Sequence, residues 1–121
     1  MARGGAIARE ARPRPRAAGG VEGGAPSFDR LIHEPIRLGI LSALSVNATL
    51  SFRDLKGILR TTDGNLSVHA RRLEVGGLLV SAKSFAGRVP RTEFRLTPGG
   101  RRALERYLVD MESWIRGLRG R

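Results

Sequence analysis

The sequence predicts a mainly α-helical domain with a small β-hairpin, an α+β fold. Three segments between residues 35 and 75 place apolar residues three or four positions apart, and a fourth such segment begins after residue 97. Between them, after Gly76 and Gly77, the apolar period changes from 3.6 to 2, which is typical of short strands. The expected order is therefore helix, helix, helix, hairpin, helix.

Composition limits the class of protein. A chain of 121 residues suggests one domain, and the absence of cysteine excludes disulfides and thiolate metal sites. No apolar run approaches the roughly 18 residues of a membrane helix, and no signal peptide is visible, so we expect no membrane partner and a cytoplasmic location. The net charge of +11 favours polyanionic partners. The basic residues are 20 Arg and only 2 Lys, and a GC-rich genome also produces this bias toward Arg. We therefore give the net charge half its weight as an argument for a polyanionic partner.

Residues 1–26 are dominated by Gly, Ala, Pro and Arg and show no apolar period. Such a segment cannot bury enough apolar surface to offset its ordering entropy, so we predict a disordered tail. It contains five arginines and two glutamates, which suits a nonspecific nucleic-acid arm as well as an inert segment.

The first helix is expected to begin at Pro35, a residue typical of the first helical position. Its apolar stripe comprises Ile36, Ile40, Leu41 and Leu44. A short strand is expected near Thr49–Leu50.

A short second helix is expected next. Ser51 with Asp54 resembles a capping box that has Asp in place of the usual Glu. We expect Leu55, Ile58 and Leu59 to form its buried side.

The third helix covers the stretch TDGNLSVHARRLE, residues 62–74, and has a polar outer face. With 100° per residue, Ala70 and Leu73 fall within about 40° of Leu66, so these three face the core. His69 lies at the edge of that side. The outward and flanking positions are Gly64, Asn65, Ser67, Val68, Arg71 and Arg72. In the DNA major groove, an Asn amide can pair with adenine, an Arg guanidinium can pair with guanine, and an apolar group can contact the thymine methyl. The alternative is that this face is an ordinary solvated surface.

The hairpin is expected to pair residues 78–85 with residues 91–97 through the turn AGRVP, with Arg88 at a basic tip and Arg91 beside it. A short helix, a tight turn, a helix with a polar outer face and then a basic hairpin form a winged helix-turn-helix.

The segments IHEPIRLGILSAL, SFRDLKGIL, TDGNLSVHARRLEVGGLL and KSFAGRVPRTEFRLTPGGRRALERYL resemble a winged-helix family of bacterial and archaeal transcriptional regulators related to the MarR and ArsR types. The resemblance covers residues 28–118 and implies a homodimer that binds DNA through the third helix and the wing. Two positions depart from the family pattern. Val68 stands where a basic residue is expected, and Ala70 stands where a Leu is expected. The metal sensing of the ArsR type does not carry over, because cysteines are absent.

The predicted DNA contacts fall into two groups. On the third helix, the major-groove group is Asn65, Ser67, Val68, Arg71 and Arg72. On the wing, Lys83, Arg88 and Arg91 are expected to contact the backbone or the minor groove.

The last helix is expected to begin with Thr97 as N-cap and Pro98 at the first position, and to end near Leu118. Its apolar residues recur at spacings of four, three, four and three, as in a heptad seam, which Tyr107 and Trp114 widen. The predicted homodimer interface is Leu104, Leu108, Met111, Trp114, Ile115 and Leu118. The alternative is that this helix covers the first helix of its own chain.

We therefore expect a tail at 1–26, a DNA-binding domain at 27–97 and a dimerisation helix at 98–121. The predicted function is sequence-specific binding of double-stranded DNA by a homodimeric transcriptional regulator, with repression favoured over activation. A protein-interaction module and an RNA-binding protein remain alternatives. We expect no enzyme, cofactor or metal site, because His33 and His69 lack carboxylates at ligand spacing. A small-molecule effector is possible, but no residue identifies one.

Overall fold

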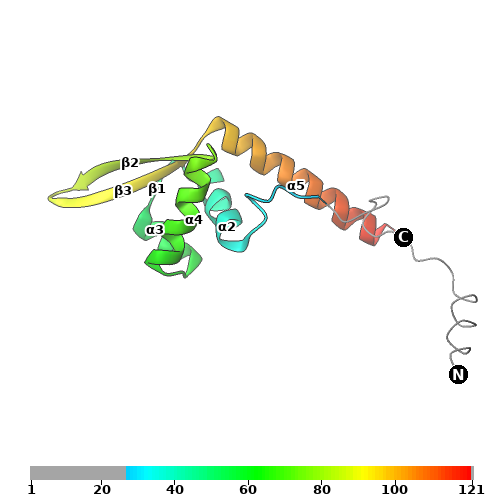
Figure 1. Cartoon of the computed structure of the whole chain (residues 1–121), viewed down its shortest axis with the longest axis horizontal. Coiled ribbons are helices and arrows are strands. Elements are labelled where there is room, and N and C mark those ends of the chain that lie inside the picture. Colours follow the sequence, from blue (N-terminus) through cyan, green and yellow to red (C-terminus); the bar gives the residue numbers. More distant parts are fainter. Residues whose placement is uncertain (1–26, 121) are drawn as a thin grey trace, which may run out of the picture. The chain divides into compact units, whose positions relative to one another are not determined.

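The computed structural model describes residues 27–120, so the predicted tail lies outside the described residues. Its elements are α2 (Pro35–Ser45), β1 (Leu50–Ser51), α3 (Phe52–Leu59), α4 (Asp63–Val75), β2 (Leu79–Ala86), β3 (Val89–Leu96) and α5 (Pro98–Arg119) (Figure 1). The predicted α+β class and order of elements are confirmed, including the short strand before α3. Residues 27–112 form one compact unit. The division at residue 98 into a DNA-binding domain and a dimerisation helix stays a prediction.

The helices begin where local sequence signals place them. Pro35 opens α2. The Ser51 hydroxyl accepts from the Asp54 backbone N–H, and the Asp54 carboxylate accepts from the Ser51 N–H, both at 3.0 Å. These contacts with Ser51, first its backbone N–H and then its side chain, hold the pKa of Asp54 below its ordinary value. The hydroxyls of Thr62 and Thr97 likewise accept N–H bonds in the first turns of α4 and α5.

The sheet is antiparallel with the strand order β1-β3-β2. β2 and β3 pair from Leu79 with Leu96 to Ala86 with Val89, whereas β1 pairs only with residues 93 and 94 of β3. The outer half of the hairpin therefore extends beyond the helices (Figure 1).

Both strands reach further toward the tip than predicted, because Ala86, Val89 and Pro90 belong to them rather than to the turn. β1 does not reach Pro90, so Pro90 occupies an edge position where its missing N–H interrupts no second ladder. Gly87 supplies a positive φ of 66° in the two-residue turn that remains.

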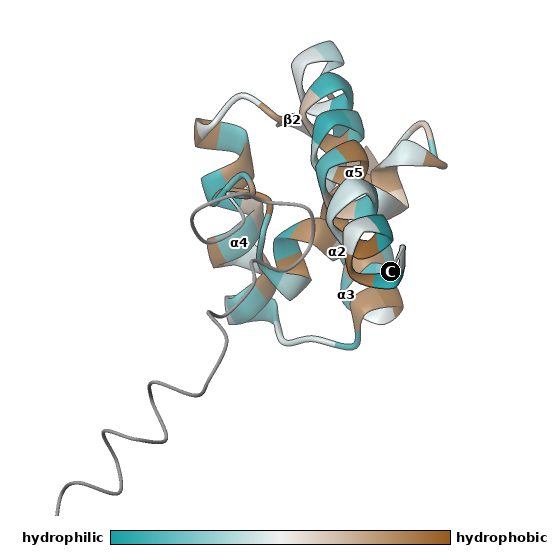
Figure 2. Ribbon diagram, turned by 90° about the vertical axis from the view of Figure 1, so that its right-hand side faces the viewer, coloured by the Kyte–Doolittle hydropathy of each residue, from teal (hydrophilic) through white to brown (hydrophobic). Residues whose placement is uncertain are grey.

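The core is made of aliphatic side chains from every helix and from the sheet. Its fully buried members are Ile32, Ile40, Leu41, Leu44, Leu55, Leu66, Leu73 and Leu79. Figure 2 shows hydrophilic and hydrophobic residues mixed along α4 and α5, as in amphipathic helices. Among residues 27–120, no helix is long and apolar enough to cross a bilayer.

The predicted buried side of α3 was wrong at one position. Ile58 is 54% exposed, whereas Leu55 is buried and Phe52 and Leu59 pack against the core. At about 100° per residue, Phe52, Leu55 and Leu59 share one face, and Ile58 lies at its margin. The ring of Phe52 packs against the ring of Phe94 of β3, with centroids 6.5 Å apart. This contact places the Phe52 side of α3 toward the core.

The first half of α5 packs into the core of its own chain. Leu104 and Tyr107 are only 4% and 3% exposed. The Tyr107 hydroxyl lies 2.8 Å from Nδ1 of His33, and burial raises the pKa of Tyr107. These two residues therefore belong to the core of their own chain, and the predicted dimer interface on α5 stays a prediction.

We expect Gly100→Ala to lower the free energy of unfolding by about 2 kcal/mol or more, because overpacking a rigid contact is costly. A Cβ at Gly100 would collide with the backbone carbonyl of Leu78, which cannot move as a flexible side chain would. Gly99→Ala is the matched control, since its Cβ would meet no atom closer than 3.8 Å. Urea unfolding of both variants checks this, and equal stabilities would contradict the close packing of α5 on Leu78.

Candidate nucleic-acid interface

The outer face of α4 presents every residue that the helical wheel placed there. Asn65, Ser67, Val68, Arg71 and Arg72 are all exposed, and the opposite side is buried through Leu66, Ala70 and Leu73. The core therefore fixes which side of α4 faces outward. The roles of the five exposed residues in DNA contact stay predictions.

Asn65 is held at the start of this face. Its Nδ2 donates to the Thr61 hydroxyl at 3.2 Å, and its backbone N–H donates to Thr62 at 3.2 Å. An amide nitrogen has two hydrogens, so one donor and the carbonyl Oδ1 remain for a base edge. The Thr61 contact restricts the side-chain rotamers before any ligand arrives.

The two arginines lie near the other end of α4, beside a shallow apolar groove. Its lining consists of Leu31, Val68, Arg71, Arg72, Val75 and Gly76. Val68 and Val75 are 53% and 79% exposed. Neither guanidinium forms an ion pair with an acidic side chain of residues 27–120. This combination suits a surface that offers both anionic oxygens and apolar groups.

The wing carries its cations on both faces of the hairpin. The register pairs Lys83 with Thr92 and Arg91 with Ser84, and side chains alternate along a strand, so Lys83 and Arg91 project from opposite faces. Arg88 is in the turn. All three residues are exposed, and Arg91 lies 3.6 Å from Glu93. The structure thus separates the wing cations from each other and from the face of α4.

Sequence reasoning missed two exposed cations on α3. Arg53 lies in its first turn, and Arg60 follows its last residue in a left-handed conformation with φ of 52°. Lys56, in contrast, pairs with Asp63 at 2.8 Å. In a helix-turn-helix the first helix crosses the DNA backbone, so exposed cations on it were a usable signal.

Comparison with known proteins decides the family. A family model described as a winged helix DNA-binding domain matches residues 36–115. The chain belongs to this winged helix family. An uncharacterized protein of Methanocaldococcus jannaschii is 34% identical over 83 residues, which are 68% of this chain and 89% of the relative.

Solved winged-helix structures agree with the fold. A transcriptional regulator homologue from Pyrococcus horikoshii has 35% identity and a TM-score of 0.69, over 73% of this chain and 87% of that one. A MarR-family regulator from Silicibacter pomeroyi has 23% identity and a TM-score of 0.57, over 71% and 57% of the two chains. The expected winged-helix family is confirmed, and the chain carries a winged helix DNA-binding domain.

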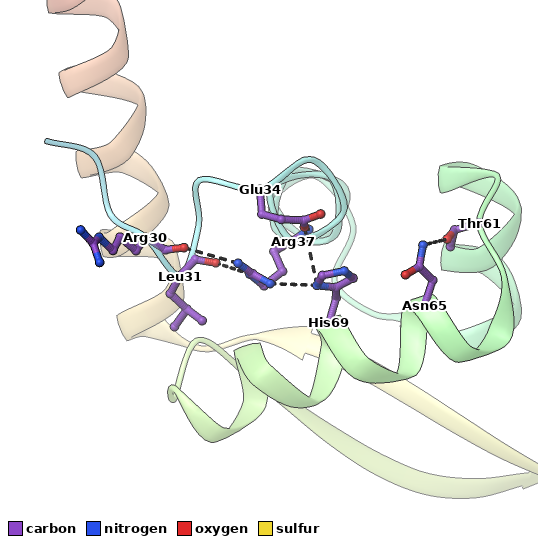
Figure 3. A network of polar contacts seen from close by, with 7 residues as sticks. All are labelled: Arg30, Leu31, Glu34, Arg37, Thr61, Asn65 and His69. Carbon is purple, nitrogen blue, oxygen red and sulfur yellow. Dashed lines mark hydrogen bonds and ion pairs between the residues drawn. The ribbon is translucent and has the colours of Figure 1, made fainter. Parts of the chain in front are cut away.

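A buried guanidinium holds α4 from the side opposite its exposed face (Figure 3). Arg37 of α2 is only 8% exposed. Its Nε donates to the Leu31 carbonyl at 2.6 Å, and its Nη2 donates to the Arg30 carbonyl at 3.4 Å. Its Nη1 lies 2.9 Å from Nδ1 of His69 on α4. One side chain thus joins the segment before α2 to α4.

The contact with Arg37 determines which ring nitrogen of His69 accepts a hydrogen bond. A guanidinium has no acceptor, so Nδ1 of His69 accepts from Arg37 and the ring proton is on Nε2. Oε1 of Glu34 accepts from the Arg37 backbone N–H at 2.7 Å and lies 3.7 Å from Nδ1 of His69. Sequence reasoning placed His69 at the core edge and missed Arg37, although an arginine in an apolar helical stripe is an unusual residue that needs partners.

Replacing Arg37 with Met is expected to lower the free energy of unfolding by about 2–4 kcal/mol. The carbonyls of Leu31 and Arg30 and Nδ1 of His69 would lose their donor, and buried groups without partners are costly. Arg30→Met is the matched control: its side chain is exposed, so a change under about 0.5 kcal/mol is expected. Thermal and urea unfolding would show the difference, and a similar small effect in both variants would argue against a structural role for Arg37.

Proposed function

We propose that the protein is a homodimeric, sequence-specific DNA-binding repressor that works in the cytoplasm on double-stranded DNA. Its recognition helix α4 enters the major groove, and its wing contacts the backbone or the minor groove. The observation behind this proposal is the outer face of α4, where Arg71 and Arg72 are exposed without acidic partners among residues 27–120. Membership of a DNA-binding family supports it.

The residues of α4 take different parts in this proposal. Asn65, preset by Thr61, donates to and accepts from an adenine edge, and Val68 contacts a thymine methyl. Arg71 points directly outward and reaches a base edge, whereas Arg72 flanks the face and holds a phosphate. Ser67 hydrogen-bonds a base or a phosphate. Lys83, Arg88 and Arg91 on the wing hold phosphates on the two sides of a groove.

Arg71→Ala is expected to weaken binding to a selected operator duplex by about 1–3 kcal/mol, because it removes a base contact. Arg72→Ala should weaken all duplexes alike and reduce the salt slope by about one, because a phosphate contact releases a counterion. Arg106→Ala, an exposed arginine on α5, is the charge-matched control. Fluorescence anisotropy at several salt concentrations measures these quantities. Unchanged affinity and salt slope in the double variant Arg71→Ala, Arg72→Ala would favour a protein-interaction module instead.

The dimer is proposed to form through the exposed part of the α5 seam. Leu108, Ile115 and Leu118 are 50%, 38% and 47% exposed, more than a monomer usually leaves on one helical stripe. Met111 packs partly against the core, and Leu104 is buried by its own chain, so the seam available to a partner is shorter than the sequence suggested. A two-fold interface of this kind would present two recognition helices to successive DNA turns.

The double variant Leu108→Glu, Ile115→Glu is expected to be monomeric, because it places charges in an apolar interface. The control replaces Arg102 and Arg106 with Glu, two exposed positions on α5 away from the seam, and should keep the assembly. Sedimentation velocity distinguishes the species. A seam variant that sediments like the wild type would show that α5 does not form the interface.

A further inference from the structure

The outer half of the wing carries an exposed aromatic side chain that the DNA contacts proposed above do not use. Phe85 is 71% exposed. The chain has four phenylalanines, and the other three, Phe28, Phe52 and Phe94, belong to the core or pack against it. Most of the Phe85 side chain is left open, because β1 ends well before that part of the sheet. Phe85 and Val89 are both largely exposed near the tip, so this end of the hairpin offers apolar surface to a partner.

The surroundings of Phe85 indicate the chemistry of that partner. Phe85 stands opposite Pro90 in the register and shares a strand face with Lys83, while Arg88 forms the tip and Arg91 projects from the other face. Glu93, the one acidic residue of the two strands, lies further toward the base and faces Arg91 at 3.6 Å. We therefore expect a partner that presents an apolar surface with anionic groups on both sides of it.

A second copy of this chain does not meet that requirement, because it would bring the same cations against each other. The minor groove of DNA does: phosphates line both sides, and the stacked bases between them are apolar on their faces. Cations on both faces of the hairpin can reach both phosphate strands, and Phe85, on the face of Lys83, can then lie against the bases between them.

We propose that Phe85 is a wedge that enters a base step from the minor groove and bends the DNA. This inference rests on the proposed function and adds a contact to it. Unstacking a step costs free energy, which burial of the ring and the added phosphate contacts of the bent duplex offset. Pyrimidine–purine steps unstack most easily, so Phe85 would favour such a step at the wing position without any hydrogen bond to a base.

The test uses the full-length protein and a duplex of about 30 base pairs selected by the wild type from a random library. Dyes at the two ends report bending by energy transfer, and 2-aminopurine placed at successive steps reports unstacking. We expect the wild type to bend the duplex and to raise the 2-aminopurine signal at one step. Phe85→Ala should abolish both signals and weaken binding about tenfold, and the salt slope should also fall, because the phosphate contacts that the bend adds are lost.

Two matched variants separate the wedge from other effects of the wing. Val89→Ala alters the other exposed large apolar side chain of the hairpin, on the opposite face, and should keep both signals. Arg88→Ala should keep the unstacking signal and reduce the salt slope by about one. Phe85 is exposed, so Phe85→Ala should melt at the wild-type temperature, which excludes misfolding as the cause.

The outcomes distinguish the wedge from the proposed function. Steep salt-dependent binding by the wild type, with no bending or with signals that survive Phe85→Ala, would overturn the wedge and leave DNA binding intact. A change in sedimentation of Phe85→Ala would assign the side chain to a contact between copies and also overturn it. No salt-dependent binding of any duplex by the wild type would overturn both proposals.

Discussion

The position of α4, the helix proposed to contact DNA, depends on the guanidinium of Arg37. It is buried behind α4 and donates to two carbonyls of the segment before α2 and to His69. A buried cation with three fixed acceptors tolerates little movement, because each lost bond leaves a desolvated group. Leucines of α2, α3 and α4 then close the core around the helix. The buried side chains of α4 all lie on this inner side, so most of its outer face is left for a ligand.

Much of the fold was predictable because its signals are local. Pro35, the Ser51–Asp54 box and the hydroxyls of Thr62 and Thr97 each set a helix start through contacts within four residues. The change of apolar period located the hairpin in the same way. The errors share a different cause. Whether Ile58 is buried depends on where β3 places Phe94, and a heptad pattern on α5 has the same spacing whether its partner is the same chain or another.

The features of the candidate site also differ in whether local sequence or distant parts of the chain determine them. A helical wheel sufficed to choose the face of α4, because one buried stripe determines what lies opposite. The geometry of the wing required the strand register, which puts Lys83 and Arg91 on opposite faces. The exposure of Phe85 required the length of β1, a two-residue strand that covers only the base of the hairpin. The partners of Arg37 are separated from it by up to 32 residues, and no local pattern indicates them.

The two halves of the α5 seam differ in what covers them. Leu104 and Tyr107 fasten the helix to the core, and Gly100 allows its first turn to approach Leu78. Leu108 then begins the part that is left exposed. The fastening therefore precedes the proposed interface along one continuous helix. A change at Gly100 or Leu104 would act on the fold of the chain itself, whereas a change at Ile115 or Leu118 would act on the proposed interface.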